Sequence, residues 1–232
     1  MKLENIKAIY FDIGYTLCKP ATGNWRVTKK FLEYVSGEYL ANTSPETIKK
    51  AYVTAYDVLN NKKVVSNLYE EVQINFDSYK SMIECFSGLA INDADIKLIS
   101  EDRTYNMHNY IFYDGVKEVF ETLKERYSIG IISDTWPSAD LMLKEVGVYE
   151  MIDSFTYSCY LGIEKPDEKM YKHALNSLGL KPENALFVDD SIKNLETAKN
   201  MGMIPILILT KEAKGNSDFI EIENLTELLM YL

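Results

Sequence analysis

The sequence predicts an α/β protein with a Rossmann-like, doubly wound parallel sheet and an inserted all-helical cap domain. After Asp114, short apolar runs typical of buried strands alternate with helical patterns of about ten residues. A long block without strand patterns separates these runs from an earlier apolar run near the N-terminus. Strands that alternate with helices form right-handed βαβ units, so we expect parallel strands with helices on both faces of the sheet.

The first predicted strand covers residues 6–12, where apolar side chains follow one another almost without interruption. This pattern is typical of a strand that is buried on both faces of a parallel sheet. The strand ends in Asp12, and Gly14 follows two residues later. An Asp in this position is commonly a turn or helix-capping residue, so it indicates a functional site only together with other residues.

Residues 25–113 carry apolar side chains at intervals of three and four, which predicts about four helices and no strand. Two helix starts are marked by Ser44, followed by a proline, and by Asn92, followed by acidic residues. We therefore assign residues 1–18 and 114–232 to the Rossmann-like core and residues 19–113 to the helical cap. Flexible connections near residues 19–24 and 113–115 would let the cap open as a lid.

The second half of the chain supplies the remaining elements of the predicted sheet. Glycines or prolines mark the ends of most helical patterns. The predicted strands are residues 129–133, 185–189 and 204–209, and the predicted helices include residues 137–147, 167–178, 192–201 and 225–232.

Composition excludes several classes of partner. The 232 residues carry a formal charge of −10, which disfavours nucleic acid and anionic membranes, since both are bound by clustered Lys and Arg. No apolar run approaches the roughly 20 residues of a membrane helix, and no signal peptide is apparent. The three cysteines have neither metal-ligand nor disulfide spacing, so we expect a reduced, cytoplasmic protein. The sequence makes no prediction of its oligomeric state.

Polar residues gather at the predicted carboxyl ends of the strands, where doubly wound sheets bind their ligands. Asp12 ends the first strand, Ser133 and Asp134 end the second, and Asp189 begins an acidic pair after the third. Lys165 lies in the loop before the helix of residues 167–178. Carboxylates, a hydroxyl and an ammonium around one point are suited to binding a divalent cation and a phosphate.

These motifs resemble those of the haloacid dehalogenase superfamily of hydrolases. They appear in the order in which that superfamily carries them, and the match covers nearly all of the Rossmann-like part. The helical block resembles the cap that one large branch inserts between its first and second motifs. The four motifs are FDIGYTL (residues 11–17), IISD (131–134), GIEKPD (162–167) with Tyr171, and FVDDS (187–191) followed by Asn194, Ala198 and Gly202.

The resemblance implies an aspartyl-phosphate mechanism with three catalytic residues. Asp12 would be the nucleophile that attacks phosphorus and forms a phosphoaspartate, which water then hydrolyses. Ser133 would donate a hydrogen bond to a phosphoryl oxygen, and Lys165 would neutralise the phosphate charge and hold Asp12 in line. Asp134 stands where the family usually has Asn. It is expected, with Tyr15, Ser133 and Lys165, among the substrate-binding residues.

The resemblance also implies Mg²⁺ as the cofactor. The expected protein ligands are the carboxylates of Asp12 and Asp190 and the backbone carbonyl of Gly14, which suit a cation that prefers oxygen and keeps several waters. Asp189 would not bind the metal directly but would support the residues that do.

Gly14 leaves the reaction open, because family phosphatases usually carry a second Asp at this position as general acid and base. Such groups are typically worth ~10²–10⁴ in rate. The first interpretation is a phosphatase of small phosphorylated metabolites, such as sugar phosphates. The second is hydrolysis of a C–halogen or C–P bond, for which a phosphonatase would need a Schiff-base lysine such as Lys62, Lys63 or Lys80. The third is a weakly active or non-catalytic protein that binds a ligand in this pocket.

Overall fold

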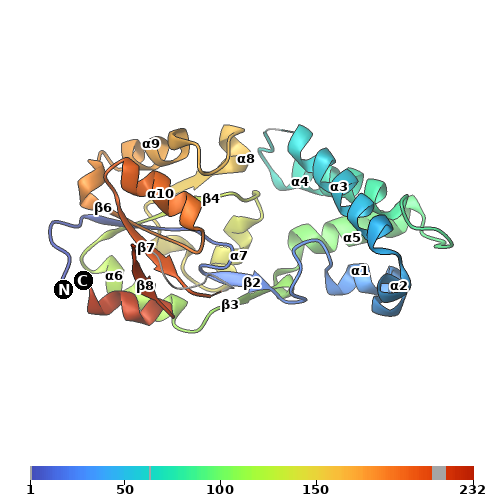
Figure 1. Ribbon diagram of the computed structural model, residues 1–232, viewed down its shortest axis with the longest axis horizontal. Coiled ribbons are helices and arrows are strands. Elements are labelled where there is room, and N and C mark those ends of the chain that lie inside the picture. The colour runs from blue at the N-terminus through green and yellow to red at the C-terminus, as the bar shows by residue number, and fades with distance from the viewer. Residues whose placement is uncertain (1, 63, 211–217) are drawn as a thin grey trace. The chain divides into compact units, whose positions relative to one another are not determined.

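The computed structural model describes residues 2–62, 64–210 and 218–232. Contacts divide the chain into two compact units, which are drawn in Figure 1. The sheet unit consists of Met1–Lys19 and Ile111–Leu232, and the helical unit consists of Pro20–Tyr110. No helix within the described ranges is both long and apolar enough to cross a membrane.

The sheet unit is built on a parallel sheet, to which the described residues contribute six strands. The strand order is β5-β4-β1-β6-β7-β8, so β1 lies between two strands that follow it much later in the chain. The doubly wound parallel fold predicted from the sequence is confirmed. The strands are β1 (Ala8–Phe11), β4 (Ser128–Ser133), β5 (Ser154–Tyr157), β6 (Ala185–Asp189), β7 (Ile204–Ile208) and β8 (Ile220–Ile222).

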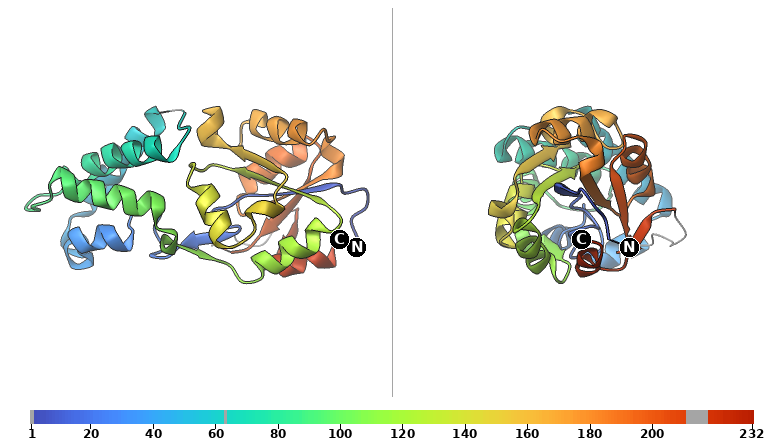
Figure 2. Two further views of the ribbon diagram at one scale, coloured as in Figure 1. Left: turned by 180° about the vertical axis from the view of Figure 1, so that it is seen from behind. Right: turned by 90° about the vertical axis from the view of Figure 1, so that its left-hand side faces the viewer.

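Helices cover both faces of this sheet, and β1 is buried between them (Figure 2). On one face, the Tyr10 hydroxyl donates a hydrogen bond of 2.7 Å to the carbonyl of Ala174 in α9 (Glu168–Ser177). On the other face, Phe11 stacks on Phe120 of α6 (Val116–Lys124), with ring centroids 4.9 Å apart. Gly130 of β4 makes room for the Tyr10 ring, because a Cβ at this position would lie 2.4 Å from it.

The other helical segments of the sheet unit are short. They include the α-helices α7 (Ala139–Glu145), α8 (Ser158–Leu161) and α10 (Ile192–Asn200) and the 3₁₀ segments η2 (Tyr149–Met151), η3 (Pro182–Asn184) and η4 (Leu225–Met230). The predicted final helix, residues 225–232, is observed as the 3₁₀ segment η4. Its tighter 3₁₀ winding is typical of short terminal segments, which gain little from the better hydrogen bonds of a longer α-helix.

The register of the three central strands brings the polar strand ends to one edge. Phe11 pairs with Ile131 of β4 on one side and with Val188 of β6 on the other. The next residue, Asp12, therefore extends beside the last residues of both neighbouring strands. This alignment places the ends of β1, β4 and β6 at a single point, where the strand order reverses and ligands bind in such sheets.

The segments that link the two units pair with each other. Strand β2 (Cys18–Pro20) lies beside β3 (Tyr110–Phe112) in a two-stranded sheet of the described chain. The prediction that residues 25–113 contain no strand is therefore wrong at its C-terminal end. Pairing satisfies backbone groups that would otherwise need water, as when the Tyr113 N–H donates to the Leu17 carbonyl at 2.9 Å.

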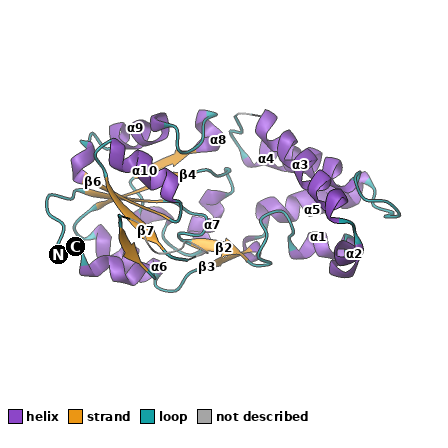
Figure 3. Cartoon of the chain, viewed as in Figure 1, coloured by secondary structure: helices purple, strands orange, loops and turns teal. Residues whose placement is uncertain are grey.

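The helical unit consists of helices packed around their own apolar core (Figure 3). The predicted helix starts are confirmed: the Ser44 side chain accepts from the Thr47 N–H, and Asn92 forms a capping box with Asp95. The helices are α1 (Lys29–Tyr34), α2 (Gly37–Asn42), α3 (Pro45–Asn61), α4 (Leu68–Ile83) and α5 (Asp93–Tyr105), with the 3₁₀ segment η1 (Met107–Asn109).

Candidate active site

Asp12 lies directly after the last residue of β1 and is held there by the sheet. Its backbone N–H donates to the Val188 carbonyl at 3.0 Å, which continues the pairing with β6 by one residue. The Asp12 side chain is only 9% exposed. A buried carboxylate at a strand end needs partners for its charge, and the surrounding residues supply them.

The turn after Asp12 is tightly wound. The Ile13 carbonyl accepts from the N–H groups of Leu17 at 2.9 Å and Cys18 at 3.1 Å. Tyr15 has a φ of 58°, in the left-handed region that bulky residues rarely adopt, and its carbonyl accepts a hydrogen bond from the Thr210 hydroxyl. Gly14 and Tyr15 thus lie where the sequence predicts, directly beyond the candidate nucleophile. Their roles toward a metal and a substrate stay predictions.

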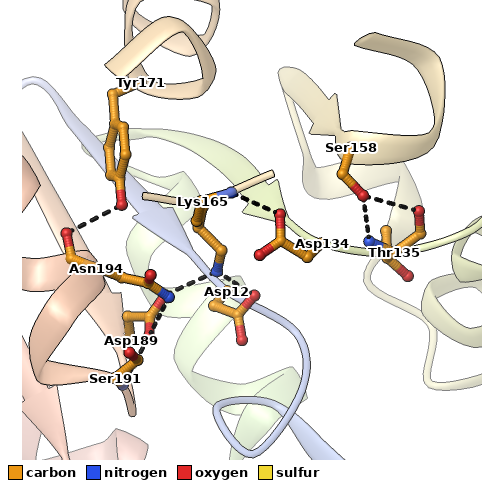
Figure 4. A network of polar contacts seen from close by, with 9 residues as sticks. All are labelled: Asp12, Asp134, Thr135, Ser158, Lys165, Tyr171, Asp189, Ser191 and Asn194. Carbon is orange, nitrogen blue, oxygen red and sulfur yellow. Dashed lines mark hydrogen bonds and ion pairs between the residues drawn. The ribbon is translucent and has the colours of Figure 1, made fainter. Parts of the chain in front are cut away.

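Lys165 joins two carboxylates at the centre of the site (Figure 4). Its Nζ lies 2.6 Å from Asp12 Oδ1 and 2.7 Å from Asp189 Oδ2, and its side chain is only 3% exposed. Burial by itself disfavours the ammonium, but the charges of Asp12 and Asp189 outweigh it and raise the pKa of Lys165. Lys165 is therefore a fixed positive charge in this site.

Asp189, the last residue of β6, is fully buried and surrounded by donors (Figure 4). Oδ1 accepts from the Ser191 N–H at 2.7 Å, and the Asn194 side-chain amide lies 3.2 and 3.0 Å from the two oxygens. Burial raises the pKa of Asp189, and Lys165 and the Ser191 N–H oppose this rise. Because both oxygens already accept hydrogen bonds, a proton could bind only by displacing a donor.

The support of Asp189 by its own loop and helix was not predicted from the sequence. Asn194 lies in the first turn of α10, and its carbonyl accepts a hydrogen bond of 2.9 Å from the Tyr171 hydroxyl of α9. The sequence signal was their place in the motifs, since Tyr171 follows GIEKPD and Asn194 follows FVDDS, but the motifs alone assign neither residue a role. Tyr171, Asn194 and Ser191 therefore position Asp189, which positions Lys165.

Asp190 completes a group of carboxylates that could hold a metal ion. One oxygen from each of Asp12, Asp189 and Asp190 lies within 4.8 Å of the others. Burial, followed by the charges of Asp12 and Asp189, raises the pKa of the half-buried Asp190 to about 7. With Lys165, these three carboxylates form the carboxylate cluster, which has two surplus negative charges when all four groups are ionised.

The donor set of the carboxylate cluster fits a hard divalent cation. All of its candidate ligands are oxygens, and a cation of charge +2 would balance the surplus. A cation would also offset the repulsion that adds to burial in raising the Asp190 pKa. The structure thus brings together Asp12, Lys165 and Asp190, three of the site residues predicted from the sequence.

The end of β4 supplies the other two predicted residues. Ser133 is the last residue of the strand and is almost fully buried, while Asp134 is exposed to solvent. Asp134 Oδ1 accepts a hydrogen bond of 2.9 Å from the backbone N–H of Lys165, so it anchors the loop that carries the lysine. This contact explains how a residue on β4 helps to place an ammonium that comes from a loop before α9.

Comparisons with known proteins find similar sequences over most of the chain. The family model of haloacid dehalogenase-like hydrolases matches residues 6–202. A glyceraldehyde 3-phosphate phosphatase of Pyrococcus furiosus is 26% identical over 98% of this chain and 94% of its own. The bifunctional epoxide hydrolase 2 of Rattus norvegicus is 30% identical, but only over 37% of this chain and 16% of its own length.

Solved structures show the same fold. The crystal structure of a dehalogenase with an intermediate complex matches with a TM-score of 0.70 and 17% identity, covering 99% of this chain and 98% of its own. The family match extends over all four strand-end motifs and over the inserted helices between the first two. The chain belongs to the haloacid dehalogenase-like hydrolases.

Proposed function

We propose that this hydrolase is a Mg²⁺-dependent phosphatase of small phosphorylated metabolites, with Asp12 as the nucleophile. The observation that carries the proposal is the carboxylate cluster, in which three carboxylates meet within 4.8 Å and Lys165 neutralises only one charge. Such a cluster is suited to a cation and a phosphoryl group together. The P. furiosus relative, which is named a glyceraldehyde 3-phosphate phosphatase, supports a small sugar phosphate-like substrate.

Each residue of the site would have a separate role in phosphoryl transfer. Lys165 would hold Asp12 and bind phosphoryl oxygens, Ser133 would donate a hydrogen bond to one of them, and Asp12 Oδ would attack phosphorus as the ester P–O bond breaks. Water would then attack phosphorus and release Asp12 and phosphate. Asp12, Asp190 and the Gly14 carbonyl would hold Mg²⁺, which when bound supplies positive charge to the phosphoryl oxygens.

The alternatives fit the charges of the site less well. Displacement of a halide by a carboxylate needs no metal, and Asp190 would add negative charge against an anionic haloacid. A phosphonatase needs a lysine that readily loses its proton, but Lys80 donates to Asp93 at 3.0 Å, and this bond raises its pKa. Lys62 is half-buried directly after the end of α3, and Lys63 lies outside the described residues.

The proposal is tested by assaying the purified protein with an aryl phosphate, an alkyl phosphate, a phosphonate and a haloacid, each with Mg²⁺ and with EDTA. We expect Mg²⁺-dependent release of phosphate, reduced at least about 10³-fold by Asp12→Asn because the nucleophile is lost. The exposed Asp57 of α3 provides the matched control, and Asp57→Asn should leave turnover unchanged. Haloacid turnover in EDTA, or undiminished turnover in Asp12→Asn, would contradict the proposal.

A further inference from the structure

We infer that Asp134 is the general acid and base of this site, which protonates the leaving oxygen and then activates water. This inference rests on the phosphatase function proposed above. It assigns to Asp134 a role beyond its contact with the loop of Lys165.

The reaction needs such a group because the residue two positions after the nucleophile is glycine. An alkyl phosphate releases an alkoxide, which is a poor leaving group unless a proton reaches its oxygen during bond cleavage. A positioned acid is typically worth ~10²–10⁴ in rate. Gly14 has no side chain with which to provide it.

The other charged groups of the site have interactions that prevent them from acting as general acid and base. Lys165 donates to Asp12 and Asp189, and the charges of these partners bind its protons tightly. Asp189 has hydrogen-bond donors on both of its oxygens. Asp190 must be ionised whenever it holds a metal ion. None of these three can lend and regain a proton without losing its own role.

Asp134 differs from them in geometry. One oxygen is fixed by the Lys165 N–H at 2.9 Å, and Figure 4 shows the other directed to the side of Lys165 and Asp12. The carboxyl is exposed, so a substrate can reach it, and its anchor is a backbone group that does not titrate. The contact therefore fixes the carboxyl and leaves one oxygen available to carry a proton.

The electrostatic surroundings favour a proton on Asp134 near neutral pH. Desolvation by surrounding protein raises the pKa of Asp134 to about 7, although water at the exposed side chain limits this rise. The ammonium and backbone N–H of Lys165 lower the pKa, while the charges of Asp12 and Glu164 raise it. The Tyr171 hydroxyl donates to the Asn194 carbonyl instead, and it is neutral because burial raises its own pKa far above neutrality.

The proton balance closes over the two steps. As Asp12 bonds to phosphorus and the ester P–O bond breaks, the Asp134 proton moves to the leaving oxygen and an alcohol departs. The Asp134 carboxylate then takes a proton from the water that attacks phosphorus. The P–O bond to Asp12 breaks, phosphate leaves, and both side chains return to their starting states.

The Asp134→Asn variant separates this role from a structural one. Its amide oxygen can still accept from the Lys165 N–H, but its side chain cannot donate and regain a catalytic proton. We expect kcat/KM for an alkyl phosphate to fall about 10²–10³-fold. The value for a nitrophenyl phosphate, whose leaving group needs no proton, should fall less than about 5-fold. The decline of the wild-type alkyl rate above pH about 7 should disappear.

A companion variant, Asp134→Ala, removes both the proton and the anchor of the loop. Equal losses for both substrates in Asp134→Asn, or a loss confined to Asp134→Ala, would overturn the inference and leave Asp134 as a positioning residue. Urea unfolding of both variants verifies that they are folded. If wild-type aryl phosphate turnover depends on Mg²⁺ and on Asp12, the proposed function stands whatever the Asp134 variants show.

Discussion

The sheet unit and the helical unit each bury charged side chains, but they balance the charge in different ways. In the carboxylate cluster, three carboxylates share one ammonium, so negative charge is left over. In the helical unit, two buried guanidinium groups are held mainly by neutral partners, with the buried carboxylate of Glu71 as the nearby negative charge. We call this group the arginine cluster (Arg26, Glu71, Asn75, Ser78, Tyr79, Arg103 and Tyr110).

The arginine cluster connects helices mainly through neutral hydrogen-bond partners, and the charge of the buried Glu71 also acts on Arg103. Arg26 donates to Asn75 at 2.7 Å and to Ser78 at 3.1 Å, and its guanidinium lies 4.0 Å from the centroid of the Tyr79 ring. Arg103 donates to the Trp25 carbonyl at 3.0 Å and to the Tyr110 hydroxyl. These contacts stabilise the guanidinium groups without a ligand from outside.

The difference separates a structural cluster from a functional one. Neutral acceptors, an aromatic face and one internal carboxylate, Glu71, can hold the guanidinium groups permanently. Carboxylates in excess repel one another until a cation binds, and this repulsion adds to burial in raising the pKa of Asp190. Burial of charge is thus a weak sign of function, whereas uncompensated charge at a strand-end edge is a strong one.

The largest expected effect comes from removing the ammonium of the carboxylate cluster. Lys165→Met leaves three carboxylates together, and we expect the free energy of unfolding in EDTA to fall by about 3–5 kcal/mol. Saturating Mg²⁺ should restore part of this loss. The exposed pair Lys172–Glu168 gives the control, since Lys172→Met should cost less than about 0.5 kcal/mol. Urea unfolding measures both losses. Similar losses in the two variants would contradict a special role for the ammonium of Lys165.

Arg26→Met tests the other cluster. The variant leaves Asn75 and Ser78 without their buried donor and removes the contact with Tyr79, so the free energy of unfolding should fall by about 3 kcal/mol. Mg²⁺ should stabilise this variant as much as it stabilises the wild type. Arg126 lies over the Tyr127 ring at an exposed position, and Arg126→Met should change stability by less than about 0.5 kcal/mol. Rescue of Arg26→Met by Mg²⁺ would contradict the structural role.

Asp190→Asn removes one expected metal ligand and one surplus charge. At Mg²⁺ 100-fold above Kd, the wild type should gain about 2.7 kcal/mol of stability, and the variant should gain little. Calorimetric titration with Mg²⁺ and thermal unfolding measure the two quantities. If Mg²⁺ stabilised Asp190→Asn as much as the wild type, Asp190 would not be a metal ligand.

The smallest expected effect is a dependence of metal-free stability on pH. The pKa of Asp190 is raised to about 7 in the folded protein, against about 3.9 when unfolded, so the folded state binds more protons between these values. The contribution of Asp190 to the free energy of unfolding is therefore fully present below pH about 4 and is lost as the pH rises toward about 7. Asp190→Asn should reduce this fall by about 1–2 kcal/mol, since water screens a half-buried carboxyl. Identical pH profiles of the two proteins in EDTA would contradict the shift.

The sequence predicts the fold best where strands are buried on both faces. β1 and β6 carry continuous apolar runs, and the predicted bounds of β6 agree with those observed. β5 was missed because Ser154 and Thr156 interrupt the apolar pattern. Both are buried next to partners that only the fold supplies, as in the 3.0 Å contact between Thr156 and His173. β2, β3 and β8 have three residues each, too few to show a period.

The candidate site was predictable to the extent that it follows from parallel register. Strand ends at one edge bring Asp12 and Asp190 together whatever the loops do, and the motif before α9 adds Lys165. The support of Asp189 by Ser191 and Asn194 depends on how α10 begins, which spacing alone does not determine. The anchoring of Lys165 by Asp134 joins positions 31 residues apart, and no sequence pattern connects them.

The central claim is that Asp12 carries the phosphoryl group, and chemical trapping tests it most directly. The protein is mixed with Mg²⁺ and an aryl phosphate, quenched in acid during turnover, and treated with borohydride, which reduces an acyl phosphate to an alcohol. Peptide mass spectrometry should find Asp12 converted to homoserine in the wild type and no conversion in Asp12→Asn. Steady phosphate release without any conversion of Asp12, or conversion at another carboxylate, would contradict the account.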